Sequence, residues 1–192
     1  MRSERYNELD KKSDLINKLS SLMIYFTLYS MIGWIYEVFL EVVVYRWGFS
    51  NRGVLTGPYL PVYGFGALVF LLLVYPIIRN KPIISKIIWM PVVFLLCMAI
   101  ATAIELGTSY ILEYLTGSWP WQTYADYAIN FQARIALSPS VRFGIGGVFF
   151  LYVLQPLFEK LSGKMSDKSR TLVALILLLI FVVDFLHTIL FK

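Results

Sequence analysis

Four glutamates lie within apolar stretches of this chain, where a carboxylate needs a partner or a function. Glu37 and Glu41 are four residues apart and Glu105 and Glu113 are eight apart, so each pair lies on one face of a helix. A charged residue at the centre of a membrane helix costs about 2.5–3.5 kcal/mol on insertion scales. A carboxylate there can accept a proton, bind a cation or orient an arginine. Glu37, Glu41 and Glu105 are therefore the candidates for a catalytic or proton-accepting role.

Four arginines match these four acids in number, and they are Arg46, Arg52, Arg134 and Arg142. A guanidinium group binds carboxylate or phosphate through two parallel hydrogen bonds. One hypothesis is a polar pocket for an anionic group, whose candidate ligand-binding residues are Asn51, Arg52, Tyr63, Asn130, Arg134 and Arg142. The other is that the acids and arginines pair with each other and fix the register of the helices, with little net gain in stability. The sequence does not decide between these two hypotheses.

The composition indicates that the segments carrying these acids and arginines lie in a membrane. Hydrophobic residues make up 58% of the 192 residues and charged residues 15%, and the mean hydropathy is +0.69. No ordinary soluble domain shows this balance. The net charge of +5 does not predict nucleic-acid binding, because the basic residues form short clusters between long apolar runs.

The apolar runs predict an all-α fold, a polytopic bundle of about five transmembrane spans. A span needs about 20 apolar residues, and the expected spans are Leu19–Val44, Tyr59–Ile78, Ile87–Leu115, Val141–Leu161 and Thr171–Phe191. Residues 1–18 form a polar cytoplasmic segment, and residues 19–192 form a single transmembrane domain.

The basic residues predict the orientation of these spans. Twelve lie in the amino-terminal segment, the second loop and the fourth loop, and five lie on the other side. The positive-inside rule then places the amino terminus in the cytoplasm and the carboxyl terminus outside. We expect the acids to lie in the outer halves of their helices. We also expect helix amino ends near Gly57-Pro58 and Ser138-Pro139 to face the same outer cavity.

The third loop, about residues 116–138, is long and aromatic. Loops longer than about 12–15 residues are usually functional or flexible, and Trp and Tyr favour the membrane interface. The loop is expected to form a short helix or a re-entrant segment at the outer surface. The alternative is that it is only an aromatic anchor.

The remaining polar residues carry weaker signals. Asp184 and His187 share a face of the last helix, where a lone histidine is more often a packing residue than a catalyst. The chain contains no nucleotide-binding, hydrolase or metal-ligand motif and a single cysteine, Cys97, so no cofactor, metal site or internal disulfide is predicted.

Four blocks of residues resemble the CmpB-like family, small bacterial membrane proteins described as type IV ABC-transporter permeases. The blocks cover about Gly33 to Leu154, and they are Gly33-Trp34-Ile35-Tyr36-Glu37, Asn51-Arg52-Gly53-x-Leu55-x-Gly57-Pro58-x-x-Pro61-x-Tyr63-Gly64-x-Gly66, Glu105 with Leu112-Glu113, and Asn130-x-x-x-Arg134-Ile135-x-Leu137. The third loop departs from the family pattern at Gln122, where an acid is expected, and at Ala133, where a glycine is expected. The resemblance implies transport across the bacterial cytoplasmic membrane.

Three functional hypotheses follow. As an ABC-transporter permease component, the chain would act with a separate ATPase and as a homodimer, because it has no P-loop and five helices make a small pathway. As an outward-facing enzyme or lipid-binding protein, it would use arginines and a glutamate on a phosphate-bearing or lipid-linked substrate. As an accessory subunit, it would stabilise a larger membrane complex. The absence of hydrolase motifs argues against an enzyme, and the expected ligand is an anionic small molecule or a lipid headgroup.

Overall fold

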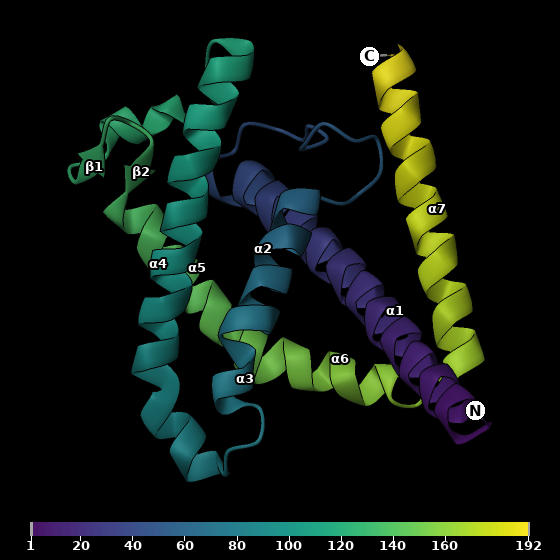
Figure 1. Cartoon of the computed structure of the whole chain (residues 1–192). Helices are drawn as coiled ribbons and strands as arrows, with labels where there is room; N and C mark the ends of the chain where they lie inside the picture. Colours follow the sequence, from purple (N-terminus) through teal and green to yellow (C-terminus); the bar gives the residue numbers. More distant parts are fainter. Residues whose placement is uncertain (1, 192) are drawn as a thin grey trace. The chain divides into compact units, whose positions relative to one another are not determined.

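In the computed structural model the chain is mostly helical (Figure 1). The structure describes the backbone of residues 2–191 and the side chains of residues 10–191. Three of the basic side chains used to predict the orientation, those of Arg2, Arg5 and Lys192, lie outside the described part. The elements are α1 Arg2–Phe39, η1 Leu40–Val44, α2 Pro61–Leu73, α3 Tyr75–Ile78, α4 Ile83–Thr116, η2 Gln122–Asp126, β1 Asn130–Phe131, β2 Ile135–Ala136, α5 Leu137–Phe149, η3 Phe150–Leu154, α6 Gln155–Ser162 and α7 Asp167–Phe191. Both η1 and η3 are single π-helical segments, and η2 is a 3₁₀ helix.

Four helical stretches in the described chain are long and apolar enough to cross a membrane. They are Asp10–Val44, Ile83–Thr116, Leu137–Ser162 and Asp167–Phe191. The second predicted span, Tyr59–Ile78, instead contains the 13-residue α2 and the 4-residue α3. The helix breaks there because Pro76 has no backbone N–H to continue the hydrogen-bond ladder. The all-α, multi-pass membrane fold is confirmed, and α2 is the shorter apolar helix within it.

The chain forms two compact units. The first unit consists of residues 1–68 and 157–192, and the second consists of residues 69–156. Helix α1 runs without interruption through the boundary predicted at residue 18. The division into a polar segment and one transmembrane domain stays a prediction.

In the first unit, α1 packs against α7 and against the start of α2. The ring of Phe26 lies 5.0 Å from that of Phe65 and 5.2 Å from that of Phe181, measured between centroids. Gly64 makes the close approach of α2 to α1 possible, because a Cβ there would lie 2.4 Å from Ser30 Oγ and 2.6 Å from the Phe26 ring. Small residues of this kind let membrane helices pack backbone to backbone.

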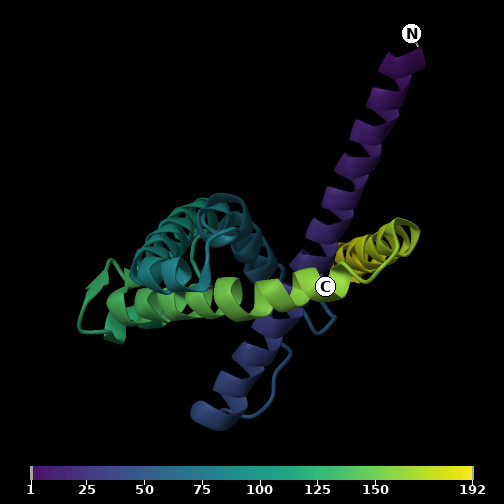
Figure 2. The same cartoon turned by 90° about the horizontal axis from the view of Figure 1, so that it is seen from below.

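In the second unit, α4 and α5 lie side by side (Figures 1 and 2). Two glycines of α5 set this packing. A Cβ at Gly144 would meet the ring of Phe94 at 2.6 Å, and one at Gly147 would meet Cys97 at 2.5 Å. Thr102 and Ser140 join the two helices through their hydroxyl groups at 2.7 Å.

The segment between α4 and α5 is ordered rather than irregular. It contains η2 and a two-stranded antiparallel hairpin in which Asn130 pairs with Ala136. Gln132 and Ala133 form the turn with φ angles of +52° and +55°, a left-handed conformation that favours glycine. The short helix expected in this loop is present as η2, and its depth in a membrane stays a prediction.

Candidate functional site

Among the acids of the first unit whose side chains the structure describes, Glu41 is the most deeply buried. It lies in the π-helical segment η1 and is 5% exposed. Its carboxylate accepts hydrogen bonds from Ser50 Oγ at 2.7 Å and from Ser50 N at 3.3 Å, and it pairs with Arg52 Nε at 3.1 Å. π-Helical segments occur frequently at functional sites. Here the segment brings a buried carboxylate against the loop that follows it.

Asn51 organises the same loop. Its Oδ1 accepts a hydrogen bond from Trp34 Nε1 at 2.8 Å, and its Nδ2 donates to the carbonyl oxygens of Thr56 at 2.8 Å and Leu55 at 3.4 Å. The amide group therefore ties α1 to the turn ahead of α2. Because both ends of the amide are used, Asn51 positions the loop.

Tyr63 and Glu37 form a second link between α1 and α2. The Tyr63 hydroxyl donates to Glu37 Oε1. The Tyr63 ring lies directly on Gly33, where a Cβ would meet it at 2.2 Å. The Gly33-to-Glu37 block of the sequence thus provides both the space for the tyrosine ring and the acceptor for its hydroxyl.

Asp184 of α7 caps this loop from the other side. Its carboxylate accepts hydrogen bonds from Thr56 N at 3.0 Å, Gly57 N at 2.8 Å and Tyr59 Oη at 2.5 Å. Burial and the Asp184 charge raise the pKa of Tyr59 well above its ordinary value, so this phenol remains a donor. Helix α2 begins at Pro61, rather than near Gly57-Pro58 as the sequence suggested.

Arg134 of the second unit is enclosed by aromatic rings. Its guanidinium carbon lies 4.1 Å from the centroid of Tyr110 and 4.0 Å from that of Trp119. The same group pairs with Glu113, and Nη1 donates to Ser109 Oγ at 3.4 Å. With two rings against its guanidinium and only 6% of the residue exposed, Arg134 fastens the aromatic loop to α4.

Asn130 stabilises the hairpin beside it. Its Oδ1 accepts from Ala133 N at 3.1 Å, and its Nδ2 donates to the Tyr127 carbonyl oxygen at 2.8 Å. These are the local side-chain to backbone bonds that asparagine commonly makes in turns. The pattern Asn130-x-x-x-Arg134 therefore has a structural basis in the loop itself.

Glu105 lies in α4 and meets the third loop through a tyrosine. Its Oε1 accepts a hydrogen bond from Tyr124 Oη at 2.8 Å. Its Oε2 is buried without a hydrogen-bond partner in the part of the chain that the structure describes. Burial and the Glu105 charge raise the pKa of Tyr124 far above its ordinary value. The pair thus offers one unused acceptor atom next to a phenol that stays protonated.

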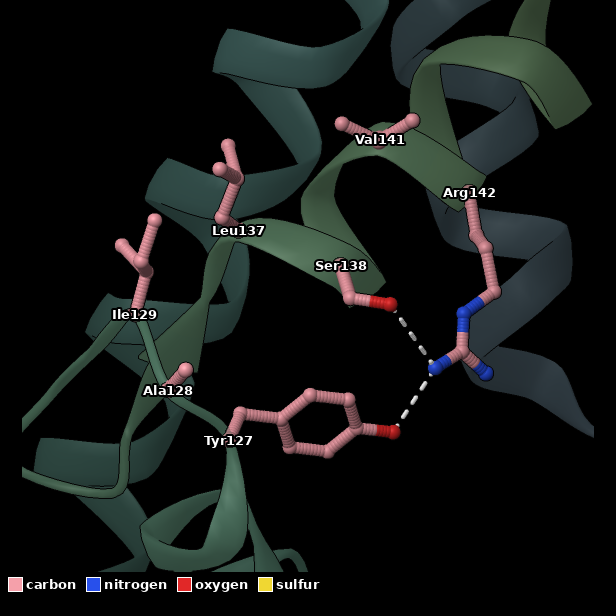
Figure 3. A pocket seen from close by; sticks show the side chains of 7 residues that line it. All are labelled: Tyr127, Ala128, Ile129, Leu137, Ser138, Val141 and Arg142. Atoms are coloured by element: carbon pink, nitrogen blue, oxygen red, sulfur yellow. Dashed lines mark hydrogen bonds between the residues drawn. The ribbon is translucent and has the colours of Figure 1, made fainter.

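Arg142 lines a cavity of about 430 Å³ at the start of α5 (Figure 3). Its Nη2 donates to Tyr127 Oη at 2.7 Å and to Ser138 Oγ at 3.3 Å. The cavity is otherwise lined by Ala128, Ile129, Leu137 and Val141. The guanidinium is thereby held beside a mostly apolar hollow, which suits a ligand with one anionic group and an apolar body.

Tyr127 connects this cavity to Glu105. Its ring meets that of Tyr124 edge to face, with 5.6 Å between the centroids. Glu105, Tyr124, Tyr127 and Arg142 thus form a continuous row of contacts from α4 through the loop to α5. The sequence singles out the carboxylate and the guanidinium but gives neither tyrosine a role, because the five aromatic residues of this loop show no spacing that distinguishes two of them.

The predicted site residues therefore fall into two groups. Glu37, Glu41, Asn51, Arg52 and Tyr63 come together in the first unit, and Glu105, Asn130, Arg134 and Arg142 belong to the second. Convergence of both groups on one outer cavity stays a prediction. Arg46 is exposed and forms no ion pair in the described part of the chain. His187 stacks near Phe191, with 5.2 Å between the ring centroids.

A sequence model of one family, described as "Putative ABC-transporter type IV", matches residues 24–189. The chain belongs to this family. The match includes every residue named in the two groups, and it confirms the resemblance seen in the sequence. No curated protein and no solved structure matched the chain. The family and the apolar helices together establish a multi-pass membrane protein related to transporters.

Proposed function

We propose that the chain is the membrane component of an ABC-type transporter and that the cavity at Arg142 takes an anionic ligand with an apolar body, such as a lipid. The observation that carries the proposal is the guanidinium of Arg142, held by Tyr127 and Ser138 at the rim of an apolar hollow. The hollow is wide open rather than enclosed, and its volume of about 430 Å³ lies in the range of small-molecule sites, about 300–1,000 Å³.

The cation and the apolar wall select different parts of such a ligand. A guanidinium binds carboxylate or phosphate through directed hydrogen bonds. Ile129, Leu137 and Val141 would contact the apolar part. Glu105, connected through the two tyrosines, is the proposed proton acceptor, because its Oε2 has no donor among the described residues.

The proposal requires a separate ATPase, because the chain has no P-loop motif. A second copy of the chain would enlarge the pathway. The proposed orientation, with the amino terminus cytoplasmic and the carboxyl terminus outside, requires α2 and α3 together to cross the membrane as a fifth segment beside the four long helices. The basic loops between α3 and α4 and between α6 and α7 would then face the ATPase. Single cysteines at Ser118 and Ser166 in a Cys97→Ala background test this orientation: an impermeant thiol reagent should label the first from outside intact cells and leave the second unlabelled.

The ligand site is tested by Arg142→Lys, with Arg46→Lys as the matched control. Lysine keeps the charge but cannot reproduce the planar two-point contact of guanidinium. Binding of an anionic lipid to the purified protein should weaken in Arg142→Lys and stay unchanged in Arg46→Lys. Equal binding by wild type and Arg142→Lys would remove the cavity from the proposal.

Affinity purification from native membranes tests the transport assignment separately. Recovery of an ATPase in a fixed ratio supports a transporter component. A bound lipid-linked substrate that is turned over without an ATPase supports the alternative of an outward-facing membrane enzyme, in which Glu105 would act as the base and Tyr124 as its neutral hydrogen-bond donor. Recovery of a larger complex that lacks an ATPase supports an accessory subunit.

A further inference from the structure

The loop after α1 exposes large apolar side chains immediately outside a membrane span. Residues 45–54, named here the Trp47 loop, follow the span that ends at Val44. Within it Trp47 is 68% exposed, Phe49 65% and Val54 75%. Tryptophan is enriched at the headgroup level of membranes, where its ring is apolar and its N–H can reach water. The loop also carries Arg46 and Arg52 and no acid.

The Trp47 loop is firmly held, so this exposure does not come from a loose chain. The backbone reverses at Arg46 and Gly48, whose φ angles are +56° and +90°. Trp47 N donates to the carbonyl oxygen of Glu41 at 3.0 Å. The Trp47 ring stacks on Tyr45 with 4.7 Å between the centroids, and Phe49 meets Trp34 edge to face at 6.3 Å.

Arg52 is oriented within the loop by a buried acid. Its Nε forms an ion pair with Glu41 Oε2 at 3.1 Å, without the geometry of a hydrogen bond. Its two terminal amino groups have no hydrogen-bond or ion-pair partner among the residues that the structure describes, and its side chain is 36% exposed. Because the Glu41 carboxylate lies at Nε, the two terminal amino groups remain as a planar two-donor fork, which matches two oxygens of a phosphate group.

We propose that the Trp47 loop is a phospholipid-binding segment, in which Trp47 and Phe49 enter the membrane interface and the end of Arg52 binds the headgroup phosphate. A phospholipid is the occupant that uses both features, because a free phosphate would leave the exposed rings without a partner and a neutral lipid would leave the fork unused. Glu41 is a positioning residue that fixes the fork. The inference goes beyond the proposed function, because it concerns the first unit and holds whether or not the chain transports anything.

The first experiment compares lipid binding by the purified, delipidated full chain, using phosphatidylglycerol and a diacylglycerol with the same acyl chains as probes. Every protein compared, including the wild-type reference, carries Arg142→Lys, so that lipid retained at the Arg142 cavity is not counted. Native mass spectrometry would measure the retained lipid. Arg52→Gln should bind phosphatidylglycerol about tenfold more weakly, the factor expected for losing a charged hydrogen bond. The matched control Arg46→Gln should change binding less than about twofold, because Arg46 has the same charge in the same loop without the buried partner. Binding of diacylglycerol should be weak in all three proteins.

Removal of Arg52 also leaves Glu41 without its cation, so the double variant Glu41→Gln/Arg52→Gln separates folding from binding. It removes both charges, and it should melt like wild type but bind phosphatidylglycerol as weakly as Arg52→Gln. Wild-type affinity in the double variant, or equal affinity in Arg52→Gln and wild type, would overturn the role of Arg52.

A second arm separates a lipid headgroup from a free anion. Inorganic phosphate should not displace phosphatidylglycerol at concentrations similar to that of the lipid, because it gains nothing from the aromatic rings. Trp47→Ser should weaken phosphatidylglycerol binding, whereas Tyr114→Ser, a control at another exposed aromatic residue, should not. Displacement by inorganic phosphate, or unchanged lipid binding in Trp47→Ser, would overturn the assignment of a phospholipid.

Discussion

Asp184 offers a direct test of how the last helix holds the loop ahead of α2. It accepts hydrogen bonds from two backbone N–H groups at 3.0 and 2.8 Å and from Tyr59 Oη at 2.5 Å. The variant Asp184→Asn keeps one oxygen acceptor but turns the other into a donor. At least one of these three donors must then lose its partner.

The size of the effect follows from these contacts. A hydrogen bond to a charged group contributes about 1.5–3 kcal/mol. Tyr59 is buried, whereas the backbone at Thr56 is exposed and can bind water instead. We therefore expect Asp184→Asn to lower the free energy of unfolding by about 2–3 kcal/mol and Tyr59→Phe by about 1–2 kcal/mol. The double variant should lose about 1 kcal/mol less than the sum, because both changes remove the same contact.

Equilibrium unfolding in mixed micelles, followed by tryptophan fluorescence, measures these values. Amide hydrogen exchange should locate the change, with Thr56 and Gly57 losing protection first. The control is Asp167→Asn, an acid in the first turn of the same helix whose side chain is 66% exposed. Asp167→Asn should lower the free energy of unfolding by less than about 1 kcal/mol. Strict additivity of Asp184→Asn and Tyr59→Phe, or equal losses for Asp184→Asn and Asp167→Asn, would refute the reasoning.

Three further changes test other parts of the structure. Arg52→Gln should lower the free energy of unfolding by about 2–4 kcal/mol, because it leaves the buried Glu41 without its cation. The double variant with Glu41→Gln should lower it by less in the same assay. Independent, additive decreases would contradict the pairing. Ala133→Gly should stabilise by up to about 1 kcal/mol, because glycine relieves the left-handed backbone at φ +55°; thermal melting that shows a clear loss would contradict this. Burial and the Glu105 charge raise the pKa of Tyr124 in the folded protein, so with rising pH the unfolded chain ionises first. The hydrogen bond of Tyr124 should therefore contribute fully to the free energy of unfolding below pH about 10, the ordinary tyrosine pKa, and progressively less above it. Unfolding of wild type and Tyr124→Phe should therefore converge with rising pH, and a constant difference up to high pH would argue against the contact.

Composition and hydropathy determined the class of this protein. Apolar runs longer than about 20 residues leave few alternatives to membrane helices, because backbone polar groups in lipid must be satisfied within the segment. Four of the five predicted runs coincide with long helices. The exception, α2 with α3, ends early through a local effect of Pro76, which an average over a long window cannot register. The family was also readable, because its second block of glycines, prolines and aromatic residues is dense enough to be specific.

Residue types showed which groups required partners, and only the tertiary structure decided which partners they have. The sequence matched four acids with four arginines, yet it could not assign Arg52 to Glu41 or Arg134 to Glu113, because the chain between the members of each pair can close in many ways. The aromatic enclosure of Arg134 and the three hydrogen bonds to Asp184 likewise join segments distant in sequence. Hydropathy and residue spacing describe a single helix, so they show that a charged residue lies within a membrane span but not which residue of another segment it contacts. Whether that charge holds a loop or meets a ligand depends on contacts that only folding creates.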